Sequence, residues 1–151
     1  MEIKDFLAPS QVVIDLRASD KARLLDELAR RAAAASGLDA ETIASALSKR
    51  EKLGSTGTGG GVAIPHARMS GIDKPVGLLA RLGKAIDFDA IDGKPVDIVF
   101  LLLLPAQAQG EQIRALARAA RALRDAEVLR SLRRAVGSAD AYRALVANGE
   151  Q

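Results

Sequence analysis

Residues 97–104 read DIVFLLLL, and the run from 98 to 104 is the longest uninterrupted apolar segment of the chain. This run is far too short to span a bilayer, so no membrane insertion is expected. A strand that is apolar on both faces is typical of the centre of a sheet that helices cover on both sides. We therefore predict that residues 97–104 form such a central strand.

The flanking segments predict the other layers. Extended segments are expected at 11–16, 62–67 and 76–82, with a turn around Asp92 and Gly93. Helices are expected from a cap at Ser19 or Asp20 to about residue 35, then over about 40–53 after a cap at Asp39, 109–124, 127–136 and 138–147. The predicted fold class is α/β, a mixed sheet sandwiched between helical layers, in one domain over residues 1–151.

The composition of the chain argues against several kinds of site and binding partner. The 151 residues include no cysteine and a single histidine, His66, so neither a disulfide framework nor a zinc site is expected. No cofactor or other metal is expected either. The net charge of +3 and the 3% of aromatic residues do not favour nucleic-acid binding. The first ten residues, MEIKDFLAPS, contain no apolar signal segment, so a cytoplasmic location is expected.

Residues 54–61 read GSTGTGGG and hold five of the 13 glycines of the chain. This segment is expected to be neither helix nor regular strand. One interpretation is a nest, in which successive N–H groups point at one anion. The alternative is a flexible connector. Known nucleotide motifs do not match, because Val62 and Ala63 stand where a Walker A loop needs lysine and serine or threonine.

His66 follows this loop directly after Pro65, which favours an extended conformation at Ile64. A neutral imidazole has one unprotonated nitrogen that can attack a phosphoryl group. Such an attack needs cations and N–H donors around the phosphoryl oxygens, which Arg50 and the loop would supply. From the residues alone, the alternative that His66 has no chemical role stays open.

The stretch KREKLGSTGTGGGVAIPHAR, residues 49–68, closely resembles the active-site signature of enzyme IIA proteins of the bacterial phosphotransferase system, fructose/mannitol class. The two leading helices, the FLLLLP strand and the helical tail also fall where that family has them. A chain of this length without an attached transport domain is most similar to the nitrogen-regulatory (PtsN-like) branch.

The resemblance implies a phosphocarrier whose His66 accepts a phosphoryl group on Nε2 from a protein of the HPr type or its paralogue NPr. It implies that Arg50 balances the phosphoryl charge. The donors of the loop itself lead us to expect phosphoryl binding at Gly54, Ser55, Thr56 and Gly57. Nitrogen-branch members regulate targets such as sensor kinases and potassium transport proteins. Fructose and mannitol members instead pass the group to a IIB domain.

One feature departs from the family, which commonly has a second active-site histidine after the FLLLLP strand. Gln112 stands at that position, and it can donate a hydrogen bond but cannot carry a positive charge. Our hypothesis is that His66 still accepts the group while onward transfer is slow or absent. The alternatives are a sugar relay to a IIB domain and a degenerate docking module that takes no phosphate.

The helix expected over 109–124 carries Arg114, Arg118 and Arg121 at helical spacing, with Arg124 close by. This row is interpreted either as a solvated helix face or as a dock for an acidic partner. The expected core-facing residues of the same helix are Leu116, Ala119, Ala120 and Leu123.

Overall fold

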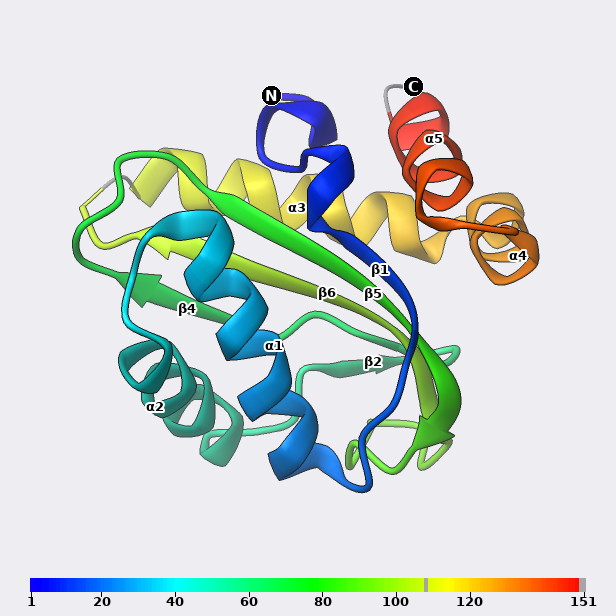
Figure 1. The fold of residues 1–151 in the computed structure, drawn as a ribbon, viewed down its shortest axis with the longest axis horizontal. Helices are drawn as coiled ribbons and strands as arrows, with labels where there is room; N and C mark the ends of the chain where they lie inside the picture. Colours follow the sequence, from blue (N-terminus) through cyan, green and yellow to red (C-terminus); the bar gives the residue numbers. More distant parts are fainter. Residues whose placement is uncertain (108, 150–151) are drawn as a thin grey trace.

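Within residues 1–107 and 109–149, which the computed structural model describes, six strands form one mixed sheet between two layers of helices (Figure 1). The strands are β1 (Val12–Leu16), β2 (Gly57–Gly59), β3 (Val62–Ala63), β4 (His66–Met69), β5 (Val76–Ile86) and β6 (Val96–Pro105). The helices are α1 (Lys21–Ser36), α2 (Ala40–Lys52), α3 (Gln109–Arg124), α4 (Ala126–Arg134) and α5 (Ser138–Gly149), and two short 3₁₀ turns precede β1, η1 (Ile3–Asp5) and η2 (Pro9–Gln11).

The strand order is β1-β5-β6-β3-β2, and β4 also pairs with β6. β6 is therefore central, as predicted, and its side chains alternate between two apolar clusters. Val99, Leu101 and Leu103 pack under α1 and α2. Ile98, Phe100 and Leu102 pack on the other face, under the layer that contains α3, α4 and α5. This arrangement confirms the predicted mixed sheet between helical layers.

The first two helices begin where their caps predict. The backbone N–H of Arg23 donates to the Asp20 carboxylate, and that of Thr42 donates to Asp39, at 2.8 and 3.0 Å. Gly37 ends α1 in the left-handed conformation, with φ of 80°, which glycine adopts without a Cβ clash. These local signals therefore fix the ends of the layer that covers one face of the sheet.

The prediction that residues 54–61 contain no regular strand is wrong. Gly57–Gly59 form β2, which pairs antiparallel with β3. Glycine disfavours strands in isolation, but here the neighbouring β3 supplies hydrogen-bonding partners. Glycine is also required at position 57, because an added Cβ would lie 2.8 Å from the Cβ of Ala90. The strand β5 also runs four residues beyond its predicted end, to Ile86.

Among the described residues, no helix is both long and apolar enough to cross a membrane.

Replacing Gly57 with alanine is expected to lower the free energy of unfolding by about 1–3 kcal/mol, because the new methyl group overlaps Ala90. The matched control is Gly83→Ala in β5, where an added Cβ has its nearest neighbour at 3.4 Å. The control is expected to leave stability unchanged or slightly raised. Urea unfolding of both variants measures the difference, and equal midpoints would contradict the proposed close approach.

Candidate functional site

His66 lies at the start of β4, on a segment that the central strand holds in place. β3 and β4 both pair with β6 in parallel and in one continuous register. Ile64 and Pro65 separate the two short strands, and the carbonyl of Pro65 still accepts a hydrogen bond from the Leu102 N–H at 2.9 Å. The backbone around His66 is therefore fixed on both sides of the proline.

Alternation along β4 places His66 and Arg68 on the same face. Ala67 and Met69 are buried in the cluster under α1 and α2. Because side chains alternate along a strand, His66 and Arg68 point to the opposite face, toward the layer that contains α3. His66 is half-buried and Arg68 is exposed. The side chain of Arg68 makes no hydrogen bond or ion pair with any described residue, and Arg68 lies about 7 Å along the strand from His66.

Arg68 is a candidate residue that the sequence analysis missed. The signal was present in the sequence, because a strand beginning at His66 puts every second residue on the same side.

A hydrogen bond to the backbone fixes the tautomer of His66. Its Nδ1 lies 2.9 Å from the carbonyl oxygen of Ile64. A carbonyl oxygen only accepts, so Nδ1 must carry the hydrogen. In the neutral imidazole the lone pair then resides on Nε2. The geometry thus leaves Nε2 as the nitrogen that can act as a nucleophile or bind a proton.

Arg50 lies in the last turn of α2, a helix that packs against β4. Its guanidinium donates to the carbonyl oxygen of Gly54 at 2.8 Å, which ties the helix end to the first residue of the glycine loop. Within the described part of the chain, no hydrogen bond joins Arg50 to His66. A guanidinium has five N–H donors, and one of them makes this bond.

The donors of the glycine loop have partners inside the protein. The Thr56 N–H donates to Oε1 of Glu51 at 3.1 Å, and the Gly57 N–H donates to Oγ of Ser55 at 3.0 Å. The hydroxyl of Ser55 in turn donates to the carbonyl of Phe88 at 2.7 Å. These groups do not point at a common anion in this structure, and the phosphoryl-binding role of Gly54, Ser55, Thr56 and Gly57 stays a prediction.

The far end of the loop is held by two other elements. The Gly60 N–H donates to Oδ2 of Asp92 at 3.0 Å. From α4, Arg133 donates to the Gly60 carbonyl at 2.8 Å and to both carboxylate oxygens of Asp97 at 2.9 and 3.0 Å. The loop is therefore a hydrogen-bonded hairpin that sets the position of β3, and not a plain connector.

Two predictions concern α3. Gln112 lies on this helix, but its side chain lies outside the part of the chain that the structure describes. The predicted arginine row is interrupted, because Arg118 donates to Glu2 at 2.8 Å and its side chain is only 12% exposed. Arg114 and Arg121 are exposed, as a solvated face requires. Ala119 and Leu123 are buried and Leu116 and Ala120 pack against the same cluster, as predicted.

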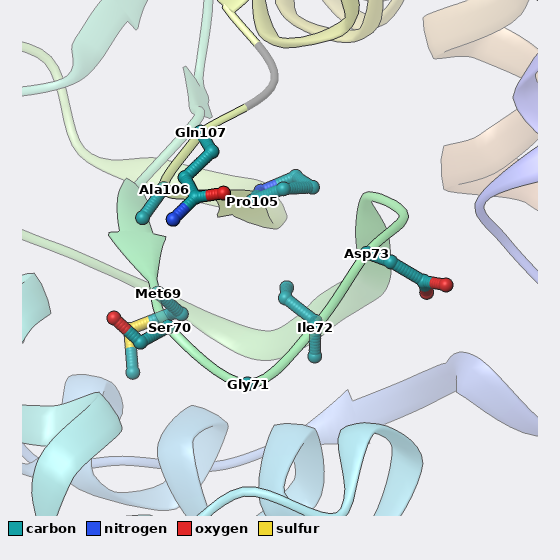
Figure 2. Close-up of a pocket in the computed structure, with 8 residues that line it drawn as sticks. All are labelled: Met69, Ser70, Gly71, Ile72, Asp73, Pro105, Ala106 and Gln107. Carbon is teal, nitrogen blue, oxygen red and sulfur yellow. The ribbon is translucent and has the colours of Figure 1, made fainter.

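A pocket of about 710 Å³ lies at the carboxyl ends of β4 and β6, the opposite end of β4 from His66. Figure 2 shows the Gln107 amide pointing into this pocket and the Asp73 carboxylate pointing away from it. Of the residues described as lining it, none carries a positive charge. The described residues also contain no group of three acidic, histidine or cysteine side chains that could hold a metal ion. This pocket therefore offers no cationic group for a phosphoryl ligand.

Comparison with known proteins identifies relatives along nearly the whole chain. The family model for the phosphoenolpyruvate-dependent sugar phosphotransferase system, EIIA 2, matches residues 5–148. The nitrogen regulatory protein of Bradyrhizobium diazoefficiens is 45% identical over 133 residues, which are 88% of this chain and 87% of that protein.

Two solved structures are also similar. The nitrogen regulatory protein IIA-Ntr from Neisseria meningitidis superposes with a TM-score of 0.89 and 36% identity, over 95% of this chain and 98% of that chain. The complex of enzyme IIAMTL and phosphorylated enzyme IIBMTL from Escherichia coli superposes with a TM-score of 0.78. At 16% identity, over 93% of this chain and 97% of that chain, the second likeness shows the fold alone.

Hydrogen bonds from the backbone N–H groups of Lys94 and Gly60 hold the pKa of Asp92 below its ordinary value. The carboxylate therefore stabilises the folded chain at pH values above that ordinary value, and this contribution is lost as pH falls through the folded pKa. Asp92→Asn is expected to lower the urea midpoint at neutral pH and to differ less from the parent below about pH 4. The exposed Asp73→Asn serves as control, and a pH-independent difference would contradict this role.

Proposed function

The chain belongs to the EIIA 2 family of the phosphoenolpyruvate-dependent sugar phosphotransferase system, and from this membership we propose that it is a regulatory phosphocarrier of the nitrogen type. His66 accepts a phosphoryl group, and the phosphorylation state controls binding to target proteins. The observation that carries the proposal is the hydrogen bond from Nδ1 of His66 to the Ile64 carbonyl, which leaves Nε2 available to attack.

The proposed transfer moves one phosphoryl group between two imidazoles. The Nε2 lone pair of His66 attacks the phosphorus atom of a donor phosphohistidine. The new Nε2–P bond forms as the donor P–N bond breaks, and the donor nitrogen recovers its lone pair. The Nδ1 hydrogen stays in place, so the ring becomes cationic while still donating to the Ile64 carbonyl, and that acceptor stabilises the new charge.

Two arginines are proposed to balance the charge of the phosphoryl group. Arg50 is anchored at the start of the glycine loop through Gly54. Arg68 shares the face of His66 and has no partner among the described residues. In this proposal the N–H groups of the glycine loop, from Gly54 to Gly57, bind the phosphoryl group only after they leave their present hydrogen-bond partners. Gln112, at the family's second histidine position, is proposed to replace a charged group with a neutral amide.

The proposed partners follow the nitrogen branch. The donor is a phosphocarrier protein of the HPr or NPr type, and the regulated proteins are of classes such as sensor kinases or potassium transport proteins. The proposed setting is the cytoplasm, and the chain is proposed to act as one IIA domain. The similarity to nitrogen regulatory proteins supports this choice over a sugar relay.

The first test is the intact mass of the protein after incubation with the general phosphotransferase enzyme, its small phosphocarrier and phosphoenolpyruvate. We expect a gain of one acid-labile phosphoryl group, absent in His66→Ala. Transfer from the loaded protein to a IIB domain is expected to be slow, because no second histidine is present. No gain, with a donor that loads another IIA protein, would contradict the proposal and favour a docking module. Rapid transfer to IIB would favour the sugar relay.

Replacing Arg50 or Arg68 with glutamine is expected to slow phosphorylation of His66 about 10- to 100-fold at saturating donor, the range that corresponds to one charge-assisted hydrogen bond. The matched control is Arg134→Gln, which removes an exposed arginine of α4. Single-turnover rates give the comparison. Equal rates in all three variants would show that neither arginine stabilises the transferred group.

A further inference from the structure

The carboxylate of Glu51, in the last turn of α2, is buried next to the glycine loop. Its side chain is 5% exposed, and Nζ of Lys21 lies 2.9 Å from its Oε1. A buried carboxylate is costly unless it is both paired and hydrogen-bonded. Glu51 meets this condition through Lys21 and through Thr56, whose N–H donates to Oε1 at 3.1 Å and whose hydroxyl donates to Oε2.

A continuous series of hydrogen bonds leads from this carboxylate to His66. Glu51 accepts hydrogen bonds from both the N–H and the hydroxyl of Thr56. The carbonyl of Thr56 accepts from the Ile64 N–H at 3.0 Å. The carbonyl of Ile64 accepts from Nδ1 of His66 at 2.9 Å. Pro65 restricts the backbone between the last two residues, so the orientation of the Ile64 peptide is passed to the imidazole.

We propose that Glu51, with Lys21 as its counter-ion, is a positioning residue for His66: it fixes Thr56, and through Thr56 and Ile64 it keeps Nδ1 protonated and Nε2 free. This inference rests on the proposed phosphocarrier function but concerns a different pair of residues. Glu51 does not touch the reacting atoms. It acts through the loop backbone.

Lys21 also contacts Phe88, whose carbonyl binds the glycine loop. Its ammonium lies 3.3 Å from the carbonyl of Phe88 and 4.5 Å from the centre of the Phe88 ring. The same carbonyl accepts the hydroxyl of Ser55, which in turn accepts the N–H of Gly57. The ammonium, on α1, therefore pairs with Glu51 of α2 and shares the Phe88 carbonyl with Ser55 of the glycine loop.

The test uses the single histidine of the chain, because its imidazole nitrogen signals need no assignment among several rings. Long-range proton–nitrogen correlation at about pH 8.5, well above the range in which an ordinary imidazole titrates, reports the tautomer. The unmodified chain is expected to show Nδ1–H. Glu51→Gln removes the charge at constant shape and is expected to raise the population of the Nε2–H tautomer and to slow phosphorylation about tenfold.

A second pair of variants keeps the proposal testable if Glu51→Gln folds poorly. Thr56→Val removes only the hydroxyl bond to Glu51, and Thr56→Ser restores it. The valine variant is expected to shift the tautomer and slow phosphorylation, and the serine variant is expected to behave like the parent. The matched control is Glu27→Gln, which removes an acidic partner of Arg30 and Arg31 on α1 and is expected to change neither readout.

The outcomes separate this inference from the proposed function. If the parent chain takes no phosphate, the phosphocarrier proposal fails, while the tautomer shift in the variants still tests the positioning role. If Glu51→Gln and Thr56→Val lower stability but leave the tautomer and the phosphorylation rate unchanged, Glu51 is merely structural and the inference is overturned. A parent chain in the Nε2–H form would overturn it as well.

Discussion

The parallel pairing of β3 and β4 with the central strand β6 positions His66 and Arg68 of the candidate site. Because the register is continuous across Ile64 and Pro65, the side chains on either side of the proline keep a defined direction. His66 and Arg68 face α3, while their neighbours Ala67 and Met69 enter the core under α1 and α2. The same strand β6 is buried on both faces, so the site rests on the most enclosed element of the fold.

The glycine loop has a different physical role from the one its composition suggests. The N–H groups of Thr56, Gly57 and Gly60 donate to Glu51, Ser55 and Asp92, and the loop backbone approaches Ala90 too closely for a side chain at position 57. The Thr56 carbonyl of the loop accepts the N–H of Ile64, whose own carbonyl accepts from the imidazole. The chain has no second histidine, and we propose that positive charge for a phosphoryl group comes from arginine side chains.

Much of the fold could be predicted from sequence because its signals are local. The two-sided apolar run of β6, the aspartate caps of α1 and α2, and Gly37 each act within a few residues. The prediction of His66 as a site residue also rests on local signals, the proline and glycines before it. What could not be predicted depends on partners distant in sequence. Lys21 reaches Glu51 from another helix, and Glu2 removes Arg118 from the predicted arginine row.

The most direct measurement of the central claim is the position of the phosphoryl group on the ring of His66, read from phosphorus–nitrogen and proton–nitrogen couplings in the loaded protein. Because Nδ1 is engaged by the Ile64 carbonyl, the group is expected on Nε2, with Nδ1 still protonated. A phosphoryl group on Nδ1 would require that hydrogen bond to break before the reaction. That result would contradict the view that the strand geometry selects the nucleophile.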